Sequence, residues 1–219
     1  MLEHFKLDPA YAVSQPHIAL QAMLLYNNTE VELLTDSGMF RMVDEAIRGG
    51  IACINKRLAT ANHEGLGAAH PVDPMRAFKR IFYIDCNNLY GAAMSAPHAV
   101  GDFRWEKPAE MMAFDWLSHD STAERGYFLE VDLEYPDEIH NRHNQYPFCP
   151  QRIRITKAQL SEQQVELRRH YNMPHSDVYS KLICNLYQKD HYVIHSRMLA
   201  LVLKHGLVLK RVHRAFSFK

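Results

Sequence analysis

No apolar run in this 219-residue chain approaches the roughly 20 residues that span a bilayer, so we expect no membrane segment. Residues 1–6 lack the basic and apolar regions of a secretory signal, which predicts an intracellular protein. The cysteines are few and far apart, without the spacing of a disulfide framework or a zinc knuckle. We expect free thiols at Cys53, Cys86, Cys149 and Cys184. With 47% apolar and 11% aromatic residues the chain can bury a core, which excludes a largely disordered tail.

The chain has no net charge, yet its charges are unevenly distributed. Residues 1–101 carry 8 basic and 10 acidic side chains, residues 102–138 carry 3 and 11, and residues 139–219 carry 14 and 4. A basic last third beside an acidic stretch is typical of a surface that meets phosphate groups on one side. The simpler interpretation is two solvated faces that attract one another, and the charge pattern alone favours it.

Helical and strand patterns alternate without the rhythm of strand-helix-strand units, which predicts an α+β fold. Helices are expected from Ser14 through Leu25, from Thr35 or Asp36 to Gly49 and Gly50, and over about residues 156–170 and 193–205. Strands are expected at residues 81–84, 126–133 and 207–218. Residues 62–79 are predicted to form a loop and residues 97–125 an irregular insertion.

The stretch with the most specific chemistry is residues 83–91, where Asp85 ends a short apolar run. An aspartate at the carboxyl end of a buried strand has a fixed backbone and faces a cleft, as a Mg²⁺ site requires. In two-metal phosphoryl transfer such a carboxylate bridges ions about 3.5–4 Å apart. Tyr90, five residues later, has a ring suited to packing against a sugar. A structural alternative stays open, in which Asp85 caps the following helix and Tyr90 packs in the core.

The pattern Asp-x-x-x-Leu-Tyr after an apolar strand, here from Asp85 to Tyr90, resembles the first catalytic palm motif of family B DNA polymerases. The string that continues through Gly91 to Met94 is similar to the protein-primed branch found in viruses, organelle plasmids and large self-replicating transposons. Other stretches are similar to the same family in the same order. Residues 7–36 resemble the end of the exonuclease region and residues 47–50 the Tyr-x-Gly-Gly element. Residues 126–135, with His140, His143 and residues 146–147 after them, resemble the segment after the first palm motif, and residues 181–186, 189–195 and 206–218 resemble a segment before the fingers.

The resemblance implies a role for each residue of the motif. Asp85 would be the catalytic carboxylate and a Mg²⁺ ligand, and Cys86 would be a ligand through its carbonyl oxygen. Asn88 and Leu89 would offer backbone amides to the triphosphate of the incoming nucleotide. Tyr90 would be the steric gate that favours deoxyribonucleotides.

The resemblance also implies partners. Arg48, Gly49 and Gly50 would contact the single-stranded template, although Ile47 stands where many relatives have an aromatic residue. The other partners would be the primer strand, deoxynucleoside triphosphates and a terminal protein that primes synthesis, the last docking on residues 101–180. No membrane partner is expected.

The implied fold is a partial polymerase palm with a long insertion, preceded by the helical tail of an exonuclease-like domain. Residues 1–46 would be the end of the exonuclease-like region and a linker. Residues 47–219 would be the N-terminal part of the polymerase domain, with the insertion at about residues 101–180. The implied function is DNA-directed DNA synthesis from a protein primer.

Two motifs of the family are absent from this sequence. It has neither the Asp-Thr-Asp hairpin, which supplies the other catalytic carboxylates, nor the fingers motif, a Lys followed by Asn-Ser-x-Tyr-Gly. One carboxylate cannot hold two Mg²⁺ ions, because Mg²⁺ gives up its hydration shell reluctantly. We therefore expect the chain to be inactive alone. The alternative is a non-catalytic remnant of a virus or mobile element that retains some nucleic-acid binding.

A metal-dependent nuclease is the main enzymatic rival. Asp132 and Glu134 resemble the first exonuclease pair, and residues two apart project from one face of a strand. Asp137, His140 and His143 follow closely. The pair stands after the palm-like motif, however, whereas in family B polymerases it precedes that motif. Solvated acids on a strand edge are the simpler interpretation.

A zinc site is a weaker possibility. His140 and His143 together with Cys149 offer three ligands of the right type, but no fourth ligand is evident and the spacing suits a loop. The 14 histidines are spread along the chain, which favours ordinary polar and core positions.

A nucleic-acid-binding module is the third alternative. Residues 139–219 interleave basic side chains with tyrosines, a combination that suits the backbone and bases of a single strand. The tyrosines concerned are Tyr171, Tyr179, Tyr187 and Tyr192. The alternative is that these tyrosines pack in an ordinary core.

Overall fold

The computed structural model describes residues 2–56, 58–120, 122–174 and 180–219, and its mixed α+β fold confirms the predicted class. An antiparallel four-stranded sheet has the order β1-β6-β2-β5, and a separate sheet pairs β3 with β4. The strands are β1 (Arg104–Glu106), β2 (Gly126–Glu134), β3 (Gln151–Arg154), β4 (Ser180–Ile183), β5 (Lys189–His195) and β6 (Val208–Phe218). The α-helices are α1 (Leu2–Phe5), α2 (Gln15–Tyr26), α3 (Ser37–Ala46), α4 (Leu89–Met94), α5 (Pro108–Ala113), α6 (Asp137–His143), α7 (Glu162–His170) and α8 (Ser196–Lys204).

Strand β2 is hydrogen-bonded along both edges. It pairs with β6 from Gly126 opposite Phe218 to Glu134 opposite Val208, and with β5 from Phe128 opposite His195. Both ladders contain a register shift near the middle of β2. The strands predicted at residues 126–133 and 207–218 are thus confirmed as β2 and β6.

Alternate residues of β2 face opposite sides of the sheet, and one side forms the main core. Leu129, Val131 and Leu133 are fully buried on that side. They belong to one apolar cluster with Leu199 and Val202 of α8, which packs against β2 and β5. The alternating apolar residues of β2 therefore pack against the apolar side of an amphipathic helix, which buries this face of the sheet.

Helix α3 covers one end of the opposite face. Met39 and Met42 of α3 pack with Phe216 and Phe218 of β6, and Phe128 of β2 packs against this cluster. Further along β2, the same face carries Glu130, Asp132 and Glu134 in place of apolar residues. The uncovered part of this face is therefore polar.

Two predicted helix starts are confirmed by their caps. Ser14 Oγ accepts a hydrogen bond from the N–H of His17 at 3.4 Å at the start of α2, and Asp36 Oδ1 accepts one from Met39 at 2.9 Å at the start of α3. The predicted end of the second helix at Gly49 and Gly50 is wrong. Helix α3 ends at Ala46, because Ile47 takes an extended conformation (φ −72°, ψ 117°).

Two later helices begin further along the chain than predicted. Thr156 opens a 3₁₀ turn (Lys157–Gln159), and α7 starts separately, with Ser161 accepting from the N–H of Gln164. Residues 193–195 belong to β5, and α8 starts at Ser196. The stretch predicted as irregular, residues 97–125, contains β1 and α5.

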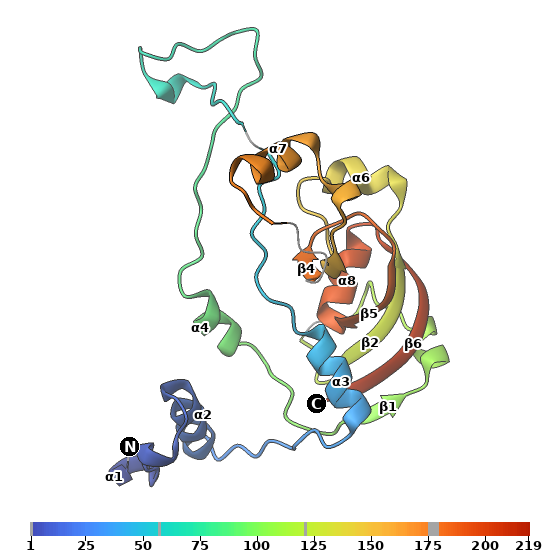
Figure 1. Ribbon diagram of the computed structural model, residues 1–219. Coiled ribbons are helices and arrows are strands. Elements are labelled where there is room, and N and C mark those ends of the chain that lie inside the picture. The colour runs from blue at the N-terminus through green and yellow to red at the C-terminus, as the bar shows by residue number, and fades with distance from the viewer. Residues whose placement is uncertain (1, 57, 121, 175–179) are drawn as a thin grey trace.

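Residues 58–96 lie outside the body that the sheet forms. Figure 1 shows the chain leaving this body after α3, extending away from it and returning through α4 to β1. Helices α1 and α2 also lie apart from the sheet (Figure 1). Among the described residues, no helix combines the length and apolar character needed to cross a membrane.

Lys189 is a fully buried amine at the start of β5. Its Nζ donates hydrogen bonds to Gln151 Oε1 at 3.0 Å, to the Asn185 carbonyl at 3.1 Å and to Asn185 Oδ1 at 2.6 Å. The three bonds satisfy an ammonium group, but all three acceptors are uncharged. Burial therefore lowers the pKa of Lys189 from 10.5 to about 8.

We predict that Lys189 makes the free energy of unfolding rise with pH. Its folded-state pKa lies below its unfolded value, so between about pH 8 and 10.5 the unfolded chain binds more protons than the folded chain. Relative to Lys189→Met, the wild type should gain stability from pH 7 upward, by about 3 kcal/mol once titration is complete. Urea unfolding at pH 7, 8.5 and 10 measures this difference.

Lys181→Met is the control, because Lys181 is an exposed lysine on β4. Its stability should follow that of the wild type at every pH. Parallel pH curves for the wild type and Lys189→Met would contradict the assignment.

Candidate functional site

The segment that contains Asp85 is extended and exposed. The exposed fraction is 99% for Tyr83 and 82% for Ile84, and no strand includes residues 81–84. The buried strand predicted there is therefore wrong for this chain. An apolar run forms a strand only where a neighbouring strand pairs with its backbone and another layer covers its side chains. No described segment does either for residues 81–84.

Helix α4 follows this segment and is capped by Asn88, not by Asp85. Asn88 adopts a left-handed conformation (φ 51°), and its Oδ1 accepts a hydrogen bond from the N–H of Gly91 at 3.2 Å. A Cβ at position 91 would collide with the folded-back Asn88 side chain, which explains the glycine. Tyr90 is 83% exposed in the first turn of α4. The structural alternative of an Asp85 cap with Tyr90 in the core is therefore wrong.

Asp85, Cys86, Asn88, Leu89 and Tyr90 thus lie along one exposed segment and do not converge on a pocket. The Asp85 carboxylate makes no hydrogen bond or ion pair with any described residue. A single open carboxylate can contact a hydrated cation but cannot fix the geometry that Mg²⁺ requires.

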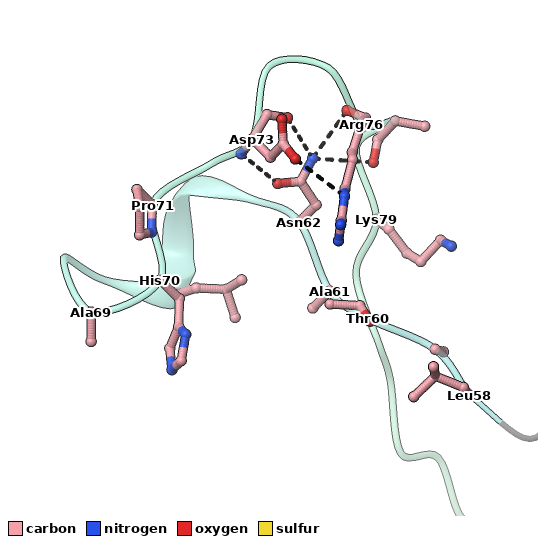
Figure 2. Close-up of a pocket in the computed structure, with 13 residues that line it drawn as sticks. Leu58, Thr60, Ala61, Asn62, Ala69, His70, Pro71, Asp73, Arg76 and Lys79 are labelled. Carbon is pink, nitrogen blue, oxygen red and sulfur yellow. Dashed lines mark hydrogen bonds and ion pairs between the residues drawn. The ribbon is translucent and has the colours of Figure 1, made fainter.

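A loop organised by Asn62 precedes this segment, as Figure 2 shows. The buried Asn62 amide donates to the carbonyls of Asp73 and Arg76, each at 3.0 Å, and its Oδ1 accepts from the N–H of Asp73 at 2.9 Å. Asn62 and Lys79 also exchange backbone hydrogen bonds that close the loop. The adjoining pocket is lined by residues of this loop and by residues 58–61 just before it (Figure 2). The loop predicted at residues 62–79 is confirmed, and the Asn62 side chain forms its hydrogen bonds with the backbone of this same loop.

Arg48 is held by the fold. Its guanidinium donates to the carbonyl of Ala46 at 3.1 Å and to that of Val193 on β5 at 2.9 Å. It also stacks over the Tyr192 ring, 4.0 Å from the ring centre. Strand β5 is an edge strand, so Arg48 satisfies a carbonyl that has no neighbouring strand. Of the three residues predicted to contact the template, Gly49 and Gly50 remain exposed and open.

The acidic and basic stretches partly neutralise one another. Lysine or arginine side chains near the C-terminus pair with acids of residues 102–138. The pairs are Lys210 with Glu134 at 2.9 Å, Arg214 with Glu130 at 2.5 Å and Lys219 with Glu124 at 2.8 Å. These contacts favour the simpler interpretation of the charge pattern. Arg152, Arg154 and Lys181 on the small sheet remain exposed.

The described residues contain one cluster that could hold a metal ion, formed by Asp132, His191 and His213. One ligand atom of each lies within 4.8 Å of those of the other two. Burial raises the pKa of Asp132, but the backbone N–H of His191 and the neighbouring His213 ring outweigh it, so the pKa lies below its usual value. Burial also opposes ionisation of Glu130, yet the His191 ring and Arg214 hold its pKa down.

The residues suggested for a nuclease site and for a zinc site do not come together in the structure. Glu134 pairs with Lys210 rather than joining Asp132 in a site. His140 and His143 lie on α6, not on a loop, and both bind Tyr135: His140 Nε2 lies 3.1 Å from its carbonyl and His143 Nδ1 lies 2.8 Å from its hydroxyl. Cys149 is buried, which raises the pKa of its thiol to about 11.

No pattern in the sequence links His191 and His213 to Asp132, because both lie far from it in the chain. Only the pairing of β5 and β6 with β2 brings them together. The one usable signal is position along the strand, because Asp132 and Glu134 are two residues apart and share one face of it.

We compared the chain with family models, curated proteins and solved structures, and none matches it.

We predict that Arg48→Ala destabilises the fold. The substitution removes two hydrogen bonds to carbonyls and one cation–π contact, so the free energy of unfolding should fall by about 1–3 kcal/mol. Arg41→Ala, at an exposed position of α3, should change it by less than about 0.5 kcal/mol. Urea unfolding of both variants measures the difference. Equal stability of Arg48→Ala and Arg41→Ala would mean that Arg48 is free to leave the sheet for another ligand.

Proposed function

We propose that this chain is part of a DNA-directed DNA polymerase that resembles the protein-primed branch of family B. The order of features in residues 81–94 carries the proposal. An apolar run leads to an exposed aspartate with an unengaged carboxylate, and a capped helix then presents an exposed tyrosine in its first turn. This is the order in which such a polymerase needs a metal ligand and a sugar-contacting ring.

The residues present do not complete a Mg²⁺ site. Asp85 stands without a second carboxylate in its segment, and the sequence has no Asp-Thr-Asp hairpin to supply one. In a complete polymerase, Mg²⁺ would neutralise charge on the attacking and leaving oxygens. In this proposal Asp85 and the Cys86 carbonyl are ligands, Asn88 and Leu89 offer backbone amides, and Tyr90 excludes a 2′-hydroxyl. The isolated chain is inactive.

The partners are a template, a primer, deoxynucleoside triphosphates and a terminal protein that docks on residues 101–180. Gly49 and Gly50 contact the template in this proposal, because the Arg48 guanidinium is already bound to β5 and stacked on Tyr192. A glycine pair without neighbours lets a nucleic-acid backbone approach closely.

The second candidate is a non-catalytic remnant that binds single-stranded nucleic acid. Tyr171 and Tyr187 are exposed by 66% and 58%, whereas Tyr192 is buried and Tyr179 lies outside the described residues. Tyr187 borders a pocket with Arg168 and Lys181, which combines a stacking surface with positive charge. Two of the four predicted tyrosines therefore remain available for this role.

The test compares primer extension by this chain with extension by the complete product of the native transcript. We expect no incorporation by the chain alone and Mg²⁺-dependent incorporation by the complete product. Asp85→Asn should abolish that activity, while Asp137→Asn, at an exposed acid on α6, should not. Tyr90→Val should raise ribonucleotide incorporation, and Tyr83→Val, at the other exposed tyrosine of the segment, should leave discrimination unchanged.

Full activity of the complete product carrying Asp85→Asn would overturn the proposal. Absence of incorporation by every product, together with salt-dependent binding of single-stranded DNA by this chain, would favour the second candidate.

A further inference from the structure

Two irregularities in the sheet bring Asp132, His191 and His213 together. In the β2–β6 ladder, Glu130 lies opposite Arg214 but Val131 lies opposite Val212, so His213 is the extra residue of a bulge. The β2–β5 ladder is also irregular beside Asp132, between Val131 and Leu133. A bulge changes which face a side chain occupies, and bulges are frequent next to functional sites.

The bulge in β6 has a visible effect on side-chain direction. Successive residues of a strand normally face opposite sides, yet Arg214 contacts Glu130 and His213 contacts Asp132, which share one face of β2. His191, on the other neighbouring strand, has a left-handed backbone (φ 49°) and reaches Glu130 on the same face. Both histidines thus flank Asp132 on the polar face.

The three side chains bring two imidazoles and one carboxylate close to one another. His213 Nε2 lies 2.8 Å from Asp132 Oδ1, which is an ion pair when the imidazole is protonated. This nitrogen is buried and has no hydrogen-bond partner among the described residues. The His191 and His213 rings stack with centroids 3.9 Å apart and planes 21° apart. An imidazole lone pair lies in the plane of its ring, and the planes of two stacked rings do not meet at one ion, so metal binding must turn the two rings out of this stack.

Neighbouring groups orient the cluster from outside. His191 Nδ1 lies 2.6 Å from Glu130 Oε1, and Arg214 Nε donates to Glu130 Oε2 at 2.5 Å. The backbone N–H of His191 donates a hydrogen bond to Asp132 Oδ1 at 2.9 Å. A carboxylate that holds one imidazole nitrogen while the other faces a metal is the usual support of a histidine ligand.

We propose that Asp132, His191 and His213 bind one divalent transition-metal ion of the zinc class. Two imidazoles and one carboxylate suit Zn²⁺, Co²⁺ or Fe²⁺, whereas Mg²⁺ and Ca²⁺ prefer oxygen ligands alone. Ligands about 2.1 Å from a tetrahedral ion lie about 3.4 Å apart. The 2.8 Å contact and the 4.8 Å limit of this cluster bracket that separation.

The cluster is accessible from solvent on the His191 side. The side chain of His191 is 63% exposed, while those of Asp132 and His213 are 20% and 14% exposed. Three protein ligands leave at least one position for water or another ligand. The ion joins β5, β2 and β6, so its binding stabilises the sheet by linkage. This proposal is independent of the polymerase proposal, which concerns Asp85.

The test is a titration of the full chain, without an affinity tag and freed of metal, with Co²⁺ and Zn²⁺. We expect one saturable equivalent, a Co²⁺ visible spectrum with nitrogen and oxygen ligation, and a rise in melting temperature with Zn²⁺. Mg²⁺ in excess should not compete. Asp132→Asn, His191→Gln and His213→Gln should each weaken Zn²⁺ binding about tenfold or more.

His140→Gln is the matched control, since His140 is one of the two histidines that the sequence pattern suggests for zinc. It should bind Zn²⁺ as the wild type does. His191→Gln keeps the test valid if the more buried variants fail to fold, because the His191 ring is largely exposed. Absence of a saturable equivalent, or equal affinity in the wild type and His191→Gln, would overturn the proposal.

Discussion

Strand β2 is hydrogen-bonded along both edges, and the two faces of this one strand organise the rest of the molecule. Leu129, Val131 and Leu133 bury one face against α8. Phe128 begins the other face, which α3 covers at one end, and Glu130 and Asp132 continue it as a polar surface. A shift of β2 by one residue would exchange these faces, so its register fixes both the core and the metal-ligand cluster.

The segment around Asp85, in contrast to β2, is not part of the sheet or of its core. Its apolar residues have no strand beside them and no layer over them, and its carboxylate has no partner among the described residues. The chemistry proposed for Asp85 needs further carboxylates and a rigid backbone, and the described residues supply neither. The two proposed sites therefore differ in kind: the cluster on β2, β5 and β6 is assembled by this chain, whereas Asp85 depends on parts that this sequence lacks.

Local signals allowed correct predictions where structure depends on neighbours in the sequence. The Ser14 and Asp36 caps rest on hydrogen bonds to residues three positions later. The alternation of residues 126–133 and the loop composition of residues 62–79 are also local sequence patterns, although β2 itself pairs with distant strands. The strand at residues 81–84 was wrong, because an apolar run becomes a strand only through distant pairing. The predicted end of α3 was wrong because Ile47 takes an extended conformation, after which Arg48 reaches β5. His191 and His213 could not be paired with Asp132 from the sequence, because bulges and register decide their direction. The division into residues 1–46 and 47–219 stays a prediction.

Hydrogen exchange of the intact chain tests most directly whether the sheet around β2 is the stable unit and the Asp85 segment stands outside it. The account predicts that backbone amides of residues 129–133 exchange slowest, since β2 is paired on both edges and buried on its core face. Amides of residues 81–86 should exchange at the rate of an unstructured peptide, because no residue that the structure describes pairs with them. Protection of residues 81–84 equal to that of β2 would contradict the account, since it would show the Asp85 strand already paired in this chain.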